Sequence, residues 1–209
     1  MLSEASGILA ASGCRAKVTG DGMTATLVDG LERAAVETTE TLLRGSGTIP
    51  PPMVHMICAD MEPSYVGFLT CRSFYRGVDA AEAVGRMGVL PSVLPATDLV
   101  VVWEYADLCT ALELAGESFP TGVVVLEAAA TEHTVRWHPF GMRVRPERGG
   151  VATVIPEWGA PARYPGGWLP DPVAALLAQW RQWREDADLE ETTAGLERAG
   201  YRMRWTARS

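Results

Sequence analysis

Two unbroken apolar runs near the middle of the chain predict buried strands. Residues 98–104 (DLVVVWE) are bounded by acids, and residues 123–126 (VVVL) form the second run. Apolar runs of this length, flanked by polar or turn residues, are typical of strands covered on both faces. A helical pattern over 106–115 and a turn near 120–122 separate the two runs. This order of strand, helix and strand predicts a right-handed βαβ unit with parallel strands.

Segments in which apolar and polar residues alternate predict further strands, which should pair antiparallel across short turns. Residues 53–59 and 65–74 are rich in aromatic and branched side chains and are expected to form one hairpin. Near the N-terminus, residues 14–19 and 23–28 flank a Gly-Asp-Gly turn and predict a second hairpin. Further strands are expected at 133–138, 142–144, 151–155 and 201–205.

Apolar residues spaced three and four apart predict helices that cover the sheet, with a polar residue at the start of most of them. Asp29, Asp79, Asp171 and Asp188 stand at such starts. Their carboxylates can accept hydrogen bonds from the free backbone N–H groups of the first helical turn. The expected helices are 31–43, 79–87, 106–115, 171 to at least 180, and 188–200, with a break in helical structure at 90–95.

These elements together predict an α+β fold. Its mixed, largely antiparallel central sheet would contain one βαβ step and would be flanked by helices. The stiff connector at 48–52 (TIPPP) is a candidate boundary, because consecutive prolines hold a chain extended. Residues 1–47 would then form an N-terminal hairpin-helix element packed on the main domain. The main sheet domain would comprise residues 48–209.

Composition indicates a packed chain with an uneven distribution of charge. Apolar residues make up 47% of the chain and charged residues 21%, and the 26 acids outnumber the 18 bases to give a net charge of −8. Seven of those eight negative charges belong to residues 87–135, the acidic segment, which contains no lysine or arginine. Its seven carboxylates are Asp98, Glu104, Asp107, Glu113, Glu117, Glu127 and Glu132.

This charge pattern bears on the possible partners. Contacts to phosphates need clustered lysine and arginine side chains, so the acidic balance argues against nucleic-acid binding. A protein more basic than this chain would be attracted by the field of the acidic segment. The one lysine, Lys17, stands in no phosphate-binding loop, and the chain has no G-x-S-x-G nucleophile motif. We therefore expect no cofactor and no nucleophilic catalysis.

Cysteine usage and hydropathy indicate a cytoplasmic location. The cysteines at positions 14, 58, 71 and 109 are widely spaced and form no C-x-x-C pair. That spacing is typical of reduced thiols rather than of a disulfide framework or a zinc site. No apolar run approaches the roughly 20 residues that cross a bilayer. The expected protein is cytoplasmic and makes no use of a membrane.

Glu104 and Glu127 are the strongest candidates for catalysis. Each ends or nearly ends one of the two apolar runs, and the carboxyl ends of parallel strands meet at one edge of a sheet, where ligands collect. His133 could add a nitrogen, and two carboxylates with an imidazole suit a divalent ion. This pattern favours a metal-assisted hydrolase as one alternative. The more common situation is that such glutamates simply mark the points where buried strands reach water.

Residues 156–170 (PEWGAPARYPGGWLP) are dense in proline, glycine and aromatic residues, and long segments of this kind are often binding loops or lids. Equally, the loop could pack its own aromatic rings onto the sheet. The leading hypothesis is a non-enzymatic interaction protein of the inhibitor, immunity or assembly-factor type. It would present the acidic surface and this aromatic loop to a protein partner, without a metal. The remaining alternative is a small-molecule binder with a pocket under the loop. The predicted partner-binding residues are Asp107, Glu113, Glu117, Trp158, Tyr164 and Trp168.

Overall fold

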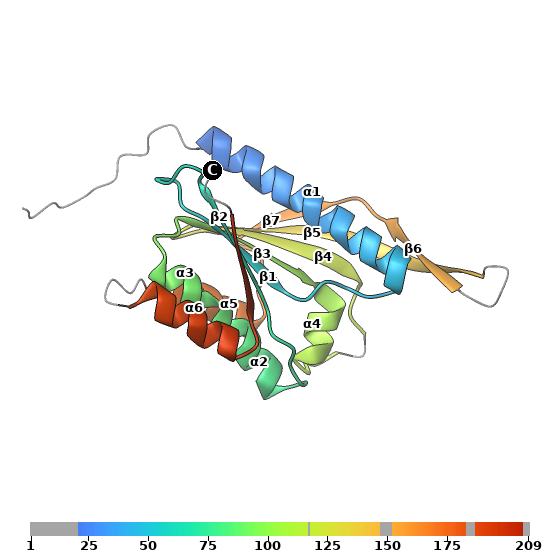
Figure 1. Cartoon of the computed structure of the whole chain (residues 1–209). Coiled ribbons are helices and arrows are strands. Elements are labelled where there is room, and N and C mark those ends of the chain that lie inside the picture. The colour runs from blue at the N-terminus through green and yellow to red at the C-terminus, as the bar shows by residue number, and fades with distance from the viewer. Residues whose placement is uncertain (1–20, 117, 147–151, 183–186, 207–209) are drawn as a thin grey trace, which may run out of the picture.

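The computed structural model describes residues 21–116, 118–146, 152–182 and 187–206. A single antiparallel sheet runs through this part of the molecule, with helices on both of its faces (Figure 1). The strands are β1 (Met53–Ile57), β2 (Tyr65–Thr70), β3 (Asp98–Glu104), β4 (Gly122–Ala128), β5 (His133–Pro146), β6 (Ala152–Trp158), β7 (Ala162–Pro165) and β8 (Arg202–Trp205). Their order is β6-β5-β4-β3-β1-β2-β8, and β7 pairs with the first half of β5. The predicted α+β class with a largely antiparallel sheet and flanking helices is confirmed.

The predicted βαβ step is wrong, because β3 and β4 are antiparallel neighbours. The helix between them, α4 (Tyr105–Ala111), has seven residues. At about 1.5 Å per residue, α4 is roughly 10 Å long, which is less than half the length of a seven-residue strand of about 23 Å. The chain re-enters the sheet at the end where it left. The backbone N–H of Gly122, which opens β4, donates to the Glu104 carboxylate at 2.8 Å.

Alternation along the strands divides the core into two layers. On β3, Leu99 and Val101 face the layer that contains most of the helices, whereas Val100 and Val102 face α1 (Asp21–Ser46). The helices of the first layer are α2 (Val78–Gly85), the short η1 (Arg86–Gly88), α3 (Val89–Val93), α4, α5 (Asp171–Arg181) and α6 (Leu189–Arg198). Within the described residues, no helix combines the length and apolarity that a bilayer span requires.

The predicted N-terminal hairpin is wrong where the structure describes it, and residues 14–19 lie outside the described chain. Residues 23–28 belong to α1, which begins well before the predicted start at residue 31. Val28, Ala35 and Leu43 are buried on one side of this helix and share the second core layer with β3 and β4. Their spacing of seven and eight residues corresponds to two helical turns, so one apolar stripe continues through the segment that resembled a strand.

After the β1–β2 hairpin, several helix and strand boundaries differ from those that the sequence predicts. Asp79 is not the cap of α2; its carboxylate binds Arg72 and the backbone N–H of Tyr75 instead. The expected break at 90–95 contains α3, which follows η1 directly. Two predicted strands, 133–138 and 142–144, are one continuous β5. Much of the predicted loop 156–170 is sheet, because β6 extends to Trp158 and β7 follows.

At the opposite edge of the sheet, the strand predicted at 201–205 is β8, and it pairs with β2. The close approach of these strands depends on Gly67, which has a φ of 148°. A Cβ at Gly67 would stand 2.2 Å from the carbonyl oxygen of Arg204 and 3.0 Å from Cα of Trp205. Any side chain at position 67 would therefore push β8 away from the sheet.

Replacing Gly67 by alanine should lower the free energy of unfolding by roughly 2–3 kcal/mol, from the clash with β8 and from the strained backbone. Thermal or urea unfolding would measure this loss. Gly30→Ala is the matched control, because a Cβ at Gly30 on α1 meets nothing within 4 Å. That exchange should instead raise stability, by up to ~1 kcal/mol. Equal stability of Gly67→Ala and the wild type would contradict the packing described for β8.

Candidate interaction surfaces

The two predicted catalytic carboxylates lie at opposite ends of the β3–β4 pair. Glu104 is opposite Val123 in the register, and Glu127 is opposite Val100. Four residues of strand, or about 13 Å, therefore separate them along the sheet. His133 opens β5 beyond Glu127, and its Nε2 lies 2.9 Å from the carbonyl oxygen of Gly167. The described residues contain no cluster of three ligand-type side chains able to hold a metal ion.

Glu104 has a local structural role. It is 4% exposed and is the N-cap of α4, where its carboxylate accepts the backbone N–H of Asp107 at 2.5 Å. The second carboxylate oxygen accepts the N–H of Gly122. Burial raises the pKa of Glu104, and these backbone N–H groups oppose part of that rise. The side chain thus joins the end of β3 to the start of both α4 and β4.

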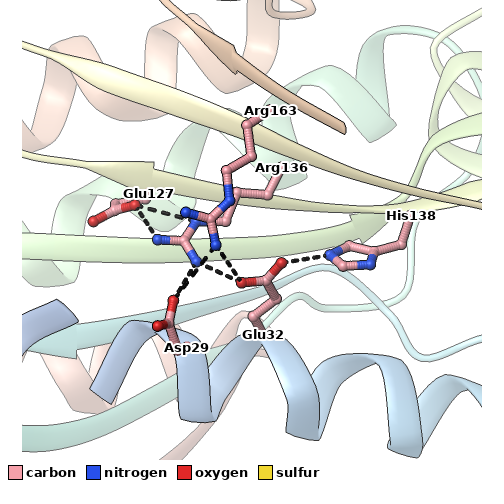
Figure 2. A network of polar contacts seen from close by, with 6 residues as sticks. All are labelled: Asp29, Glu32, Glu127, Arg136, His138 and Arg163. Atoms are coloured by element: carbon pink, nitrogen blue, oxygen red, sulfur yellow. Dashed lines mark hydrogen bonds and ion pairs between the residues drawn. The ribbon is translucent and has the colours of Figure 1, made fainter. Parts of the chain in front are cut away.

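Glu127 belongs to an ion-pair network between the sheet and α1 (Figure 2). At its centre is Arg136 of β5, whose side chain is only 5% exposed. The guanidinium Nη1 donates to Asp29 at 2.7 Å and also to Glu32, both on α1. The Nη2 group donates to Glu127 at 2.6 Å. His138 lies 2.8 Å from the other oxygen of Glu32.

The charges in this network compensate one another. Burial alone would lower the pKa of Arg136, but hydrogen bonds to its three carboxylate partners outweigh burial and raise it. The hydrogen bond from Arg136 lowers the pKa of Asp29. Arg163 of β7 adds a longer contact, with its Nη2 3.6 Å from Glu32. The network fixes α1 to β4, β5 and β7, and its carboxylates are engaged by arginine rather than free to bind a ligand.

Two carboxylates of the acidic segment remain exposed beside α4. Asp107 lies on α4 one helical turn before Ala111, and Glu113 follows the helix. The Glu113 carboxylate lies against Gly77, where an added Cβ would stand 3.1 Å from Glu113 Oε2. Gly77 is the N-cap of α2, so the carboxylate lies near the positive end of that helix. Glu117 lies outside the described residues.

The connection from β2 to α2, together with the first residue of α2, exposes the two least covered large apolar side chains of the described chain. Tyr75 is 85% exposed and Val78 is 84% exposed. We call Tyr75, Val78, Asp107 and Glu113 together the loop surface. Sequence patterns did not single out Tyr75 or Val78, because an isolated aromatic residue in a short loop carries no period that distinguishes exposed from buried positions.

Several hydrogen bonds connect this segment to the neighbouring elements. The Arg72 guanidinium binds Asp79 Oδ1 at 2.5 Å, and Asp79 Oδ2 accepts the backbone N–H of Tyr75 at 2.7 Å. The hydrogen bond from Arg72 lowers the pKa of Asp79. The N–H of Gly77 donates to the carbonyl of Ala111 at 2.8 Å, which ties the loop to α4. The exposed side chains therefore project from a backbone that is hydrogen-bonded to Asp79 and to α4.

The three predicted aromatic residues of segment 156–170 lie in different surroundings. Trp158 is half-buried, donates its Nε1–H to Glu40 of α1 at 3.2 Å, and packs edge-on against Phe140. Tyr164 on β7 is 50% exposed, and Trp168 in the next connection is 64% exposed. Only the latter two are therefore accessible enough to serve as large contacts for a partner.

A second accessible surface lies at the other end of the sheet. A groove with a cavity volume of about 340 Å³ passes between the turn after β1, α6 and β8, over Leu94, Leu189 and Trp205. It continues into an open hollow of about 630 Å³ along α6, beside Glu190 and Glu197. We call this feature the α6–β8 groove. The alternation of β8 alone could not reveal it, because the same pattern also fits a Trp205 packed into the core.

No protein-family model, no curated protein and no solved structure matches this chain. The geometry of the described residues therefore provides the basis for a functional proposal.

Replacing Arg136 by leucine should lower the free energy of unfolding at pH 7 by about 3 kcal/mol, because it removes the buried cation shared by three carboxylates, of which Glu32 is the most buried. The lowered pKa of Asp29 implies stability that is present above its unfolded pKa of about 3.8 and is lost as the pH falls. When the pH is lowered from about 5 to about 3, the free energy of unfolding should therefore fall by less in the variant than in the wild type. Urea unfolding across this pH range measures both effects.

Arg143→Leu is the control for this experiment. Arg143 also pairs with a glutamate, Glu157, but the two side chains are 67% and 55% exposed. Loss of such a surface pair should change the free energy of unfolding by less than ~1 kcal/mol. A comparable effect of both substitutions would mean that the Arg136 network does not anchor α1.

Proposed function

We propose that this protein is a non-enzymatic interaction protein that binds a more basic protein partner through the loop surface. The observation that carries the proposal is the pairing of Tyr75 and Val78, both more than four-fifths exposed, with the adjoining Glu113 carboxylate. Exposed large apolar side chains on a hydrogen-bonded backbone are typical anchors of protein interfaces. An inhibitor, immunity or assembly factor would use such a surface.

The backbone at Glu113 supports a functional role for its side chain. Glu113 is the one non-glycine residue of the described chain with a positive φ, at 54°. A left-handed conformation costs an L-amino acid roughly 1–2 kcal/mol, which glycine would avoid. The glutamate at this position therefore supplies a carboxylate at some expense in stability. Strain of this kind is concentrated at functional sites.

Charge should direct the partner toward this surface. Asp107 and Glu113 are exposed, and neither carboxylate forms an ion pair within the described residues. The whole chain carries a net charge of −8, so a basic partner is attracted from a distance and then oriented locally. Tyr164 and Trp168 on the β7 side remain predicted contacts for the same partner or for another one.

The cysteine residues support a cytoplasmic site of action. Cys58, Cys71 and Cys109 are free and buried in the described chain. Burial raises the pKa of Cys58 to about 11 and that of Cys71 to about 12, so neither thiol is a ready nucleophile. Buried, unpaired thiols are common in reducing compartments. They also favour a binding role over cysteine catalysis.

The proposal is tested by placing the photo-crosslinking residue p-benzoylphenylalanine at position 75 in cells of the native host. The residue at position 75 should capture a single protein that is more basic than this chain. The purified partner should bind Glu113→Gly about tenfold more weakly than the wild type, although this variant should be more stable because it relieves the strained backbone. Affinity should also fall steeply as salt rises. Titration by calorimetry measures each affinity.

Glu132→Gln is the matched control, because Glu132 is an exposed acid of the same segment at the opposite end of the sheet. Its partner affinity should equal that of the wild type. A second crosslinking position, at Tyr164, distinguishes the loop surface from the exposed side of β7. Capture from position 164 with none from position 75, or equal binding by Glu113→Gly, would show that the loop surface is not the interface.

A further inference from the structure

The α6–β8 groove combines an apolar floor with an acidic margin. Trp205 is 45% exposed and Leu189 is 36% exposed, although both line a concave surface rather than a protruding one. Glu62 lies at one side of the groove, and Glu190 and Glu197 lie one above the other along α6. These three carboxylates have no hydrogen-bond or ion-pair partner among the described residues. Apolar side chains accompanied by positive charge would complement this surface.

The groove runs beside an open edge of the sheet. β8 ends the strand order, and no further strand pairs with it in the described chain. The N–H of Thr206 donates inward to the carbonyl of Val66 at 2.9 Å. Because backbone groups alternate in direction along an antiparallel strand, those of Met203 and Trp205 point outward from the sheet. A row of outward donors and acceptors therefore lies next to the groove.

The two faces of β8 carry different chemistry. Trp205 is opposite Gly67 and Met203 is opposite Leu69, on the side of the sheet that bears α6. Arg204 is opposite Phe68 and Arg202 is opposite Thr70, so both arginines face the other side. Both are exposed. A strand added to this edge would meet an apolar, acidic environment on one face and a basic environment on the other.

We infer that the α6–β8 groove binds an extended segment of a protein partner, which adds to the sheet as an antiparallel strand beside β8. The segment alternates in character: apolar and basic side chains enter the groove, and acidic side chains face Arg202 and Arg204. Backbone pairing supplies affinity and the alternating side chains supply specificity, as in other strand additions. This inference stands on different residues from the loop surface and does not depend on it.

Charge disfavours a second copy of this chain as the occupant. Two β8 strands paired antiparallel would place Arg202 and Arg204 of one copy opposite the arginines of the other. Like charges directly opposite each other on a sheet destabilise the pairing. A small organic cation would fit the floor of the groove but would leave the outward backbone groups of Met203 and Trp205 unused. An extended peptide chain uses both features.

The test uses a fluorescein-labelled peptide, Thr-Lys-Glu-Leu-Glu-Lys-Thr. Its lysines and leucine share one face of a strand, its glutamates share the other, and its side chains sum to zero charge. The control peptide, Thr-Glu-Lys-Leu-Lys-Glu-Thr, has the same composition with the charges exchanged between faces. Fluorescence anisotropy with the full-length protein should show at least tenfold weaker binding of the control, because each charge then meets a like charge.

Backbone pairing is tested separately with N-methylated peptides. In an antiparallel addition, residues whose side chains enter the groove also direct their N–H groups toward β8. A methyl group on the leucine nitrogen should therefore reduce affinity about tenfold or more. The same methyl group on the following glutamate nitrogen points away from β8 and should leave affinity within about twofold. Equal losses for both peptides would overturn the strand addition.

Protein variants locate the site. Glu190→Lys combined with Glu197→Lys should weaken the first peptide about tenfold, whereas Glu191→Lys should not weaken it, since Glu191 does not line the groove. Circular dichroism checks that all three proteins remain folded. Three results would overturn the inference: equal affinity for both peptides, binding unchanged by the paired substitution, or a concentration-dependent dimer in sedimentation that excludes the peptide.

Discussion

The ion pairs of Arg136 are the interaction on which the layered arrangement depends. A sheet that is apolar on both faces must be covered on both. One face carries several helices, and on the other face α1 is the one helix among the described residues. Arg136 binds two carboxylates of α1 and one of β4. A buried cation of this kind fixes the position of a helix more strictly than apolar contacts do, because shifting the helix would leave several charges unpaired. The second core layer lies between α1 and the sheet and includes residues of β3 and β4.

The structure also shows which groups the carboxylates of the acidic segment contact. Glu104 caps α4, Glu127 neutralises Arg136, and Glu113 lies against the start of α2. Three of the seven carboxylates of the segment therefore lie against other elements, and they are spread over both ends of the sheet. Further carboxylates that have no ion-pair partner among the described residues lie where no charge pattern indicated them, on α6 beside the groove. Net charge along a sequence thus locates only some of the charged positions on the surface.

Local patterns predicted much of the fold and little of the candidate sites. The boundaries of β3 and the cap of α6 at Asp188 follow directly from apolar runs and short polar residues. The direction of β4 could not be read from the same pattern, because buried parallel and antiparallel strands are equally apolar. The predicted meeting of Glu104 and Glu127 depended on that direction. Exposure of Tyr75, Val78 and Trp205 depends on long-range packing, which periodicity does not encode.

The two accessible surfaces lie at opposite ends of the strands, and this arrangement limits the kind of partner that could use both. The loop surface follows the end of β2, whereas the α6–β8 groove includes the turn that precedes β2. The six residues of β2 separate them by about 20 Å. A compact partner docked on one surface would need an extended arm to reach the other. Such a two-point contact gains affinity through effective concentration, because the second contact forms within a complex that already exists. The strand-like segment inferred for the groove is the form that such an arm would take.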